Sequence, residues 1–263
     1  MKRIKLTTAY DGTNYHGSQI QNHGETVEGV LRRALSVLLQ EKINLIGASR
    51  TDAGVHAEGN VYVFDTESSI PPEKFVFALN AGLPEDIRIQ DSCEVPLDFH
   101  PRHQDTIKTY EYRILNRSLP LPQYRLYTHF VYEPLDVEKM REACPYFIGE
   151  HDFASFCASG SQAESTVRII YDLHVAKSGE VITITVSGNG FLYNMVRIIA
   201  GTLIHVGSGK IKPSDIEKII DGKDRKLAGP TAPAKGLTLK KIRYPEYEKS
   251  LVNSIKNLSF RKL

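Results

Sequence analysis

The spacing of apolar residues divides the first hundred residues into a regular series of elements. Ile4, Leu6 and Tyr10 alternate as in a strand, and the apolar residues that follow the capping residue Thr26 recur at helical spacing to about Gln40. Further strands are expected at 43–46, 60–66 and 87–94, and a second helix at 72–80. The resulting order, strand-helix-strand-strand-helix-strand, predicts an antiparallel sheet covered on one face by two helices.

The second half of the chain repeats this mixture of strands and helices at low sequence similarity. Strands are expected at 106–115, 169–176, 181–187 and 236–244, and helices at 136–147, at 191–206 and from Pro213. A long insertion is expected at 151–162, where Phe153 and Phe156 either stack on bases or plug the loop into the core, and we favour the plug. From Glu246 onward, apolar spacing predicts an amphipathic helix.

These elements predict an α+β protein with two domains and a cleft between them. We place the first domain at 1–103, the second at 104–246 and a C-terminal tail at 247–263. The length of 263 residues is sufficient for two cores of ordinary size.

The composition is that of a soluble globular protein, with 41% hydrophobic and 24% charged residues and no apolar run long enough to span a bilayer. Charged and apolar residues alternate at the N-terminus, where a signal peptide would have a continuous apolar core. The three cysteines are scattered without the spacing of a zinc site, as expected of reduced thiols. We therefore expect a cytoplasmic protein with no membrane partner.

The net charge of +2 hides an asymmetry between the two halves. Residues 1–100 carry 9 basic and 14 acidic side chains, whereas residues 101–263 carry 24 basic and 17 acidic ones. An anionic polymer would bind mainly to the second half, although a moderate basic excess is also typical of a solvated surface.

The strongest candidate site is a run of small and polar residues from Gly47 to Ala57, between two apolar segments. Glycines and alanines near Asp52 permit a sharp turn and the close approach of a ligand. Arg50 lies two positions from Asp52, so both face one side if the chain is extended, and the arginine favours an ionised carboxylate. Such a carboxylate can act as a nucleophile or a base, but an Asp that only caps a turn fits the spacing equally well.

Three residues outside this run have alternatives that the pattern leaves open. Tyr110 is either a core aromatic of its strand or a ring that stacks on a base, as the neighbouring Lys108 and Arg113 favour. Arg197, within an apolar helix, either pairs with a buried anion, a carboxylate or a phosphate, or extends to the surface. Lys235, in a loop of small residues, either meets a substrate or only connects a helix to a strand.

Two short runs resemble known binding motifs but lack residues that those motifs need. The run at 207–210 resembles the end of a phosphate-binding loop, but Ile204 stands where the motif needs Gly and Ile211 replaces the Ser or Thr that holds magnesium. Asp52 and His56 lack a third ligand nearby, so we expect no metal site and a hydrogen-bonding role for His56.

From its first strand to about Tyr244, the chain resembles the TruA family of tRNA pseudouridine synthases. The most specific block is Arg-Thr-Asp-Ala-Gly-Val-His-Ala around Asp52. Six blocks occur in the family's order, at 10–17, 47–57, 108–112, 152–156, 190–197 and 228–233. One departure is Ser18, where the family usually carries an aromatic residue; we expect it to affect the packing of its loop and the choice of tRNA, and to leave the chemistry alone.

The resemblance implies two ferredoxin-like halves with a basic cleft between them, a homodimer that holds tRNA across both subunits, and no cofactor. It implies isomerisation of uridine at positions 38 to 40 of the anticodon arm. It also implies that Asp52 is the nucleophile, that Tyr110 packs on the target base and that Arg197 pairs with Asp52. We also expect Arg50 to be a catalytic residue. Three further residues are expected to contact the substrate: Thr51, His56 and Lys235.

Making pseudouridine breaks the N1–C1′ bond, turns the uracil and rejoins it through C5. Asp52 can attack C1′, attack C6 or remove the 2′ proton, and each of these needs the same ionised carboxylate. An RNA N-glycosidase is an alternative, but it needs a second carboxylate, for which the loop offers only Glu58. A non-catalytic RNA-binding module needs only basic and aromatic residues, and it leaves an arginine paired with Asp52 unexplained.

Overall fold

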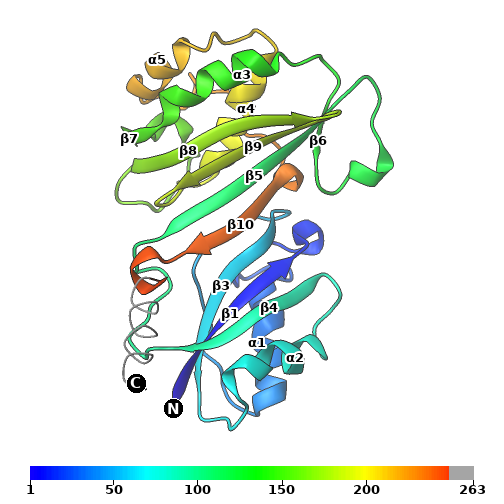
Figure 1. The fold of residues 1–263 in the computed structure, drawn as a ribbon, viewed down its shortest axis with the longest axis vertical. Helices are drawn as coiled ribbons and strands as arrows, with labels where there is room; N and C mark the ends of the chain where they lie inside the picture. The colour runs from blue at the N-terminus through cyan, green and yellow to red at the C-terminus, as the bar shows by residue number, and fades with distance from the viewer. Residues whose placement is uncertain (249–263) are drawn as a thin grey trace, which may run out of the picture.

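A single ten-stranded sheet runs through the computed structural model, which describes residues 1–248 (Figure 1). Its order is β4-β1-β3-β10-β5-β9-β8-β7, with β2 paired to β3 and β6 to β5. The strands are β1 Lys2–Tyr10, β2 Ile46–Gly47, β3 His56–Thr66, β4 Ile87–Val95, β5 Ile107–Asn116, β6 His129–Val131, β7 Gly149–Asp152, β8 Val167–Ser178, β9 Val181–Gly188 and β10 Leu237–Arg243.

The antiparallel strands expected in the two halves belong to one continuous sheet. Strand β10, from the second half, lies between β3 and β5 and pairs with both. It runs parallel to β3 and antiparallel to β5. The backbone hydrogen bonds of this one strand therefore connect the two halves into a continuous sheet.

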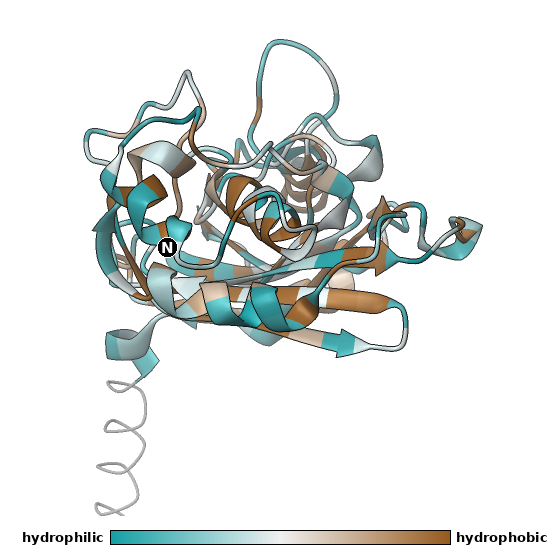
Figure 2. Cartoon of the chain, turned by 90° about the horizontal axis from the view of Figure 1, so that it is seen from above, coloured by the Kyte–Doolittle hydropathy of each residue, from teal (hydrophilic) through white to brown (hydrophobic). Residues whose placement is uncertain are grey.

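The helices gather on one side of the sheet (Figure 2). Buried and less buried residues alternate along β1 and β9, as expected of strands with one covered face. The α-helices are α1 Val27–Leu39, α2 Phe75–Asn80, α3 Val137–Ala143, α4 Met195–Gly207 and α5 Asp215–Asp221. The 3₁₀-helices are η1 Gly12–Asn14, η2 Pro72–Lys74, η3 Pro122–Tyr124, η4 Cys144–Phe147, η5 Ala154–Phe156 and η6 Ala234–Gly236. Within residues 1–248, no helix has the length and apolar character needed to cross a membrane.

Most of the elements expected from the sequence are confirmed, and three are wrong in extent. The strand expected at 60–66 begins four residues earlier, at His56. Only Ile46–Gly47 joins the sheet in the segment expected as a strand at 43–46, because Ile43 and Leu45 are buried in the core without a strand partner. The helix expected from position 191 begins at Met195, because Asn194 adopts a left-handed conformation with φ 60°.

The segment expected as an insertion at 151–162 begins inside the edge strand β7, which pairs with β8. Phe153 and Phe156 are fully buried and contact each other edge to face, which confirms that they plug the loop into the core. The amphipathic helix expected after Glu246 lies mainly outside the described residues.

The loop that carries Asp52 is bound to the loop after β1 through its neighbour Thr51. The Thr51 amide donates to Ser18 Oγ at 2.8 Å, and the Ser18 amide donates to the Thr51 carbonyl at 3.0 Å. Gly17 has a φ of +91°, and a Cβ there would lie 2.9 Å from the same carbonyl. The Thr51 hydroxyl also bonds to the Tyr10 hydroxyl at 2.8 Å. Ser18 is only 2% exposed, and its bonds to Thr51 hold the loop after β1 against the residue that precedes Asp52.

We expect Ser18→Ala to lower the free energy of unfolding by about 1–3 kcal/mol, because it leaves the buried Thr51 amide without its side-chain acceptor. Urea unfolding followed by circular dichroism measures the change. Ser178→Ala, at the exposed end of β8, is the matched control and should change stability by less than about 0.5 kcal/mol. Equal stability of the two variants would show that the bond to Ser18 does not hold this loop.

Candidate active site

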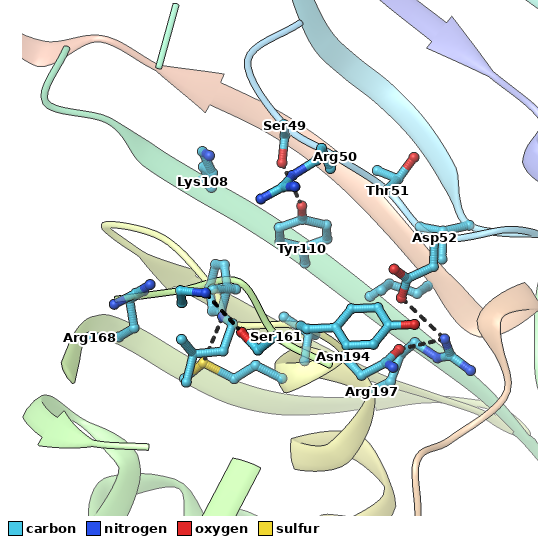
Figure 3. A pocket seen from close by; sticks show the side chains of 18 of the residues that line it. Ser49, Arg50, Thr51, Asp52, Lys108, Tyr110, Ser161, Arg168, Asn194 and Arg197 are labelled. Atoms are coloured by element: carbon cyan, nitrogen blue, oxygen red, sulfur yellow. Dashed lines mark hydrogen bonds and ion pairs between the residues drawn. The ribbon is translucent and has the colours of Figure 1, made fainter. Parts of the chain in front are cut away.

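A cavity of about 580 Å³ brings together three of the residues expected in the site, Asp52, Tyr110 and Arg197. Its walls come from segments far apart in the sequence (Figure 3). Most of the lining residues lie in the loop before β3, strand β5, the loop at 160–163 and the segment at 191–197, and three further segments contribute Arg102, Arg168 and Leu237. The two halves of the chain therefore contribute to one site.

Arg197 pairs with Asp52 across 145 positions of sequence (Figure 3). Its Nη1 donates to Asp52 Oδ2 at 3.2 Å and to Asn194 Oδ1 at 2.7 Å, while its Nε donates to the Ala232 carbonyl at 2.7 Å. The arginine side chain is 17% exposed and that of Asp52 is 30% exposed. Of the three alternatives for Arg197, the structure therefore shows pairing with a carboxylate. The contact is made through Nη1 alone and is not bidentate.

Tyr110 is buried in the wall of the cavity, with its hydroxyl 3.0 Å from Ser49 Oγ. Its ring contacts Phe191 edge to face, with the centroids 5.3 Å apart. Burial raises the pKa of Tyr110 to about 12, and the negative charge of Asp52 acts in the same direction. The phenol is therefore neutral at physiological pH.

The remaining expected site residues divide into two groups. Arg50 and Thr51 line the cavity, with Arg50 exposed and Thr51 buried. His56 and Lys235 are not among its lining residues. Within the described chain Arg50 makes no ion pair with Asp52, so the sequence-based argument that Arg50 holds this carboxylate is wrong, and Arg197 has that role.

His56 holds two loops together instead of facing the cavity. Its Nδ1 accepts a hydrogen bond from the Gly12 amide at 3.1 Å, and its Nε2 lies 3.0 Å from the Leu126 carbonyl. The ring also contacts Tyr127, with the centroids 5.0 Å apart. Within residues 1–248, no group of three His, Cys, Asp or Glu side chains could hold a metal ion.

Three basic residues line the cavity but were not predicted as site residues from the sequence: Arg102, Lys108 and Arg168. Burial, together with the positive charges of Arg102, Arg168 and Arg50, lowers the pKa of Lys108 to about 8. The position of Lys108 beside Tyr110 was the only local signal for any of them. Arg102 lies in the connection between the halves, and Arg168 lies at the start of β8, 60 positions from Lys108 in sequence.

The cavity is strongly positive. Five basic residues line it, Arg50, Arg102, Lys108, Arg168 and Arg197, and Asp52 is the one acidic residue among its lining residues. Glu58, the second carboxylate near the Asp52 loop in sequence, is exposed, does not line the cavity and is paired with Lys240. The arrangement fits an anionic ligand whose reacting part meets a single carboxylate.

Comparison with known proteins agrees with this geometry. The family model for tRNA pseudouridine synthases matches residues 6–104 and 143–245, which include Asp52 and Arg197, whereas Tyr110 lies between the two matched ranges. A tRNA pseudouridine synthase A of Ruminiclostridium cellulolyticum is 53% identical over 245 residues, which are 93% of this chain and the whole of that protein. One of Acetivibrio thermocellus is 48% identical over 244 residues, with the same coverage of both chains.

A third relative, named tRNA pseudouridine synthase A 2 of Clostridium perfringens, is 49% identical over 244 residues and is also covered over its whole length. Each of these three relatives is matched over 93% of this chain. The chain belongs to the tRNA pseudouridine synthases, a family of isomerases.

Proposed function

We propose that this protein isomerises uridine to pseudouridine at positions 38, 39 and/or 40 in the anticodon arm of tRNA, with Asp52 as the nucleophile. The observation that carries the proposal is the position of Asp52: it is the only carboxylate among the lining residues of a basic cavity, which it shares with Tyr110 and Arg197. A polyanion such as tRNA fits the charge of the cavity, and the chemistry needs one ionised carboxylate.

Hydrogen bonding leaves one oxygen of Asp52 available for chemistry. Arg197 donates to Oδ2, whereas Oδ1 has no hydrogen-bond partner within residues 1–248. The arginine orients the carboxylate and stabilises its negative charge, and the free oxygen can attack C1′ or C6 or remove the 2′ proton. Each route leaves the N1–C1′ bond broken and the uracil held in the cavity before it is rejoined through C5.

Tyr110 supplies a surface on which the detached base can turn without leaving. Its ring lines the cavity and is held in place by Ser49 and Phe191. Aromatic rings stack on flipped bases and keep them in a pocket. Because the phenol is neutral at physiological pH, it serves as a surface and a hydrogen-bonding group and does not act as a phenolate base.

The proposal includes an architecture and an assembly. Residues 1–103 and 104–246 would form two ferredoxin-like halves with the basic cavity between them, and 247–263 a tail. The strand order β4-β1-β3, with β2 on the other side of β3, supports this view for the first half. A homodimer in the cytoplasm would hold one tRNA across both subunits. Thr51 would act at the substrate site, whereas His56 and Lys235 lie outside the lining of the cavity.

The two alternatives are less well supported. An RNA N-glycosidase needs a second carboxylate near the scissile bond, and Glu58 lies outside the cavity. A non-catalytic RNA-binding module has no use for a carboxylate that is paired with an arginine inside a basic cavity, so this function leaves the pair of Asp52 and Arg197 unexplained. Incubation with tRNA separates the three functions, because the isomerase forms pseudouridine, the glycosidase releases free uracil and the module leaves the base unchanged.

We expect Asp52→Asn to reduce pseudouridine formation by at least about a thousandfold, because the amide has nearly the same size but is not a nucleophile. Affinity for tRNA should stay within a few-fold, since phosphate contacts elsewhere dominate binding. Turnover is measured by nucleoside analysis of the tRNA, with Asp91→Asn on the exposed side of β4 as the matched control. Near-normal product from Asp52→Asn would remove this residue from the mechanism.

Tyr110→Phe and Tyr110→Ala separate the ring from the hydroxyl. Phe keeps the stacking surface and loses only the bond to Ser49, so we expect it to retain most of its affinity for tRNA. Ala removes the surface and should weaken binding by about 1–3 kcal/mol, the range for stacking of one base. If the two variants are equally inactive and bind equally, the hydroxyl and not the ring is what the reaction needs.

Arg197→Lys should lower kcat by about a hundredfold or more with little change in tRNA affinity. One ammonium group on a flexible stem cannot meet Asp52, Asn194 and the Ala232 carbonyl in the way that a planar guanidinium does. Single-turnover rates and equilibrium binding measure the two effects separately, and Arg141→Lys in α3 is the control. A loss that appears in the salt dependence of binding instead would mean that Arg197 contacts a phosphate.

A further inference from the structure

The cavity has two ends that differ in charge (Figure 3). Asp52 and Arg197 lie at one end, where the carboxylate is neutralised by its ion pair. Lys108 and Arg168 lie toward the other end, with Tyr110 between the two groups. Arg102 also lines the cavity. The mechanism proposed above uses the first end and the ring of Tyr110, and it gives no role to the basic end.

The cations of the basic end are held by neutral groups. Lys108 Nζ donates to the Ala48 carbonyl at 3.3 Å, Arg102 Nε to the Gly47 carbonyl at 2.6 Å, and Arg168 Nη1 to the Ser165 carbonyl at 2.9 Å. Among residues 1–248, none of these three side chains forms an ion pair with a carboxylate. Backbone carbonyls fix the positions of the cations without cancelling their charge, so the positive field is available to a ligand.

This arrangement costs free energy when the cavity holds no anion. Lys108 is half-buried. Its pKa falls because it loses water and because the positive charges of Arg102, Arg168 and Arg50 act on it together. Repulsion between the cations and the loss of water from Lys108 both disfavour the charged state, and a bound anion would relieve both. Like charges gathered without a counter-ion in a substrate cavity are therefore evidence for an anionic ligand at that point.

We infer that Lys108 and Arg168, with Arg102 beside them, form a subsite for one phosphodiester group of the RNA strand next to the extruded uridine. This inference rests on the proposed function, since it places the uridine on Tyr110 and its chain beyond that ring. A phosphodiester carries one full negative charge and two free oxygens, which match an ammonium and a guanidinium. The subsite would fix the strand so that the nucleotide enters with its sugar toward Asp52, and it would act on binding and not on the chemical step.

The test measures binding in the Asp52→Asn background, where no turnover occurs. Equilibrium affinity of a tRNA transcript is determined over a range of KCl concentrations for the parent, Lys108→Met, Arg168→Met and the double variant. If both cations contact one phosphate, each single variant lowers the slope of log affinity against log salt by about 1, and the double variant lowers it little further. Lys218→Met, an exposed lysine of α5, is the control and should keep the parent slope.

A synthetic anticodon stem-loop with single methylphosphonate groups then identifies the phosphate. We expect one position near the target uridine at which removing the charge weakens binding to the parent about tenfold but does not weaken binding to Lys108→Met further. Thermal melts verify that each variant is folded, and Lys108→Arg, which keeps the charge, should bind like the parent.

Three results would overturn the subsite. The Lys108 and Arg168 variants could bind with the affinity and salt slope of Lys218→Met, or no methylphosphonate position could couple to Lys108. Alternatively, inorganic sulfate could bind at millimolar concentration in a Lys108-dependent manner without competing with RNA, which would make this an anion site unrelated to the strand. Formation of pseudouridine by the wild-type protein is measured separately, so that failure of the subsite and failure of the proposed function give different results.

Discussion

The ion pair between Asp52 and Arg197 is the contact on which the site depends. It joins residues 145 positions apart, from the loop before β3 and from α4. Each partner is held by its own half: Thr51 is bonded to Ser18 and Tyr10, and Arg197 to Asn194 and the Ala232 carbonyl. The carboxylate therefore meets a guanidinium whose direction is already set, so little conformational freedom is lost when they pair.

The continuous sheet positions the two halves relative to one another. β10 lies next to both β3, which begins just after the Asp52 loop, and β5, which carries Tyr110. The loop before β10 supplies the Ala232 carbonyl that holds Arg197, and Ala234 of the same loop would contact a Cβ placed on Gly54. One segment thus connects the two walls of the cavity through backbone hydrogen bonds, which are more rigid than a side-chain contact between mobile domains.

The charge of the cavity follows a simple division of roles. One cation, Arg197, is paired with the single carboxylate of the lining, which is the pair that the proposed mechanism uses. The others are bound to carbonyl oxygens or exposed and keep their charge for the substrate. In the sequence, the basic excess of residues 101–263 could not be distinguished from an ordinary solvated surface. Its relation to a cavity depends on which side chains converge there.

Local pattern determined the elements and the family. Alternation located most of the strands, helical spacing located α1, α3 and α5, and the block around Asp52 indicated the family, because these signals lie within a few residues of sequence. Tertiary structure decided where those elements meet. It placed β10 between the halves, took His56 out of the cavity and brought Arg102 and Arg168 to Lys108. It confirmed the pairing of Arg197 with Asp52 that the family resemblance implies, and within the described residues it showed no ion pair between Arg50 and that carboxylate. Such contacts depend on the packing energy of distant segments, which leaves no periodic trace in the chain.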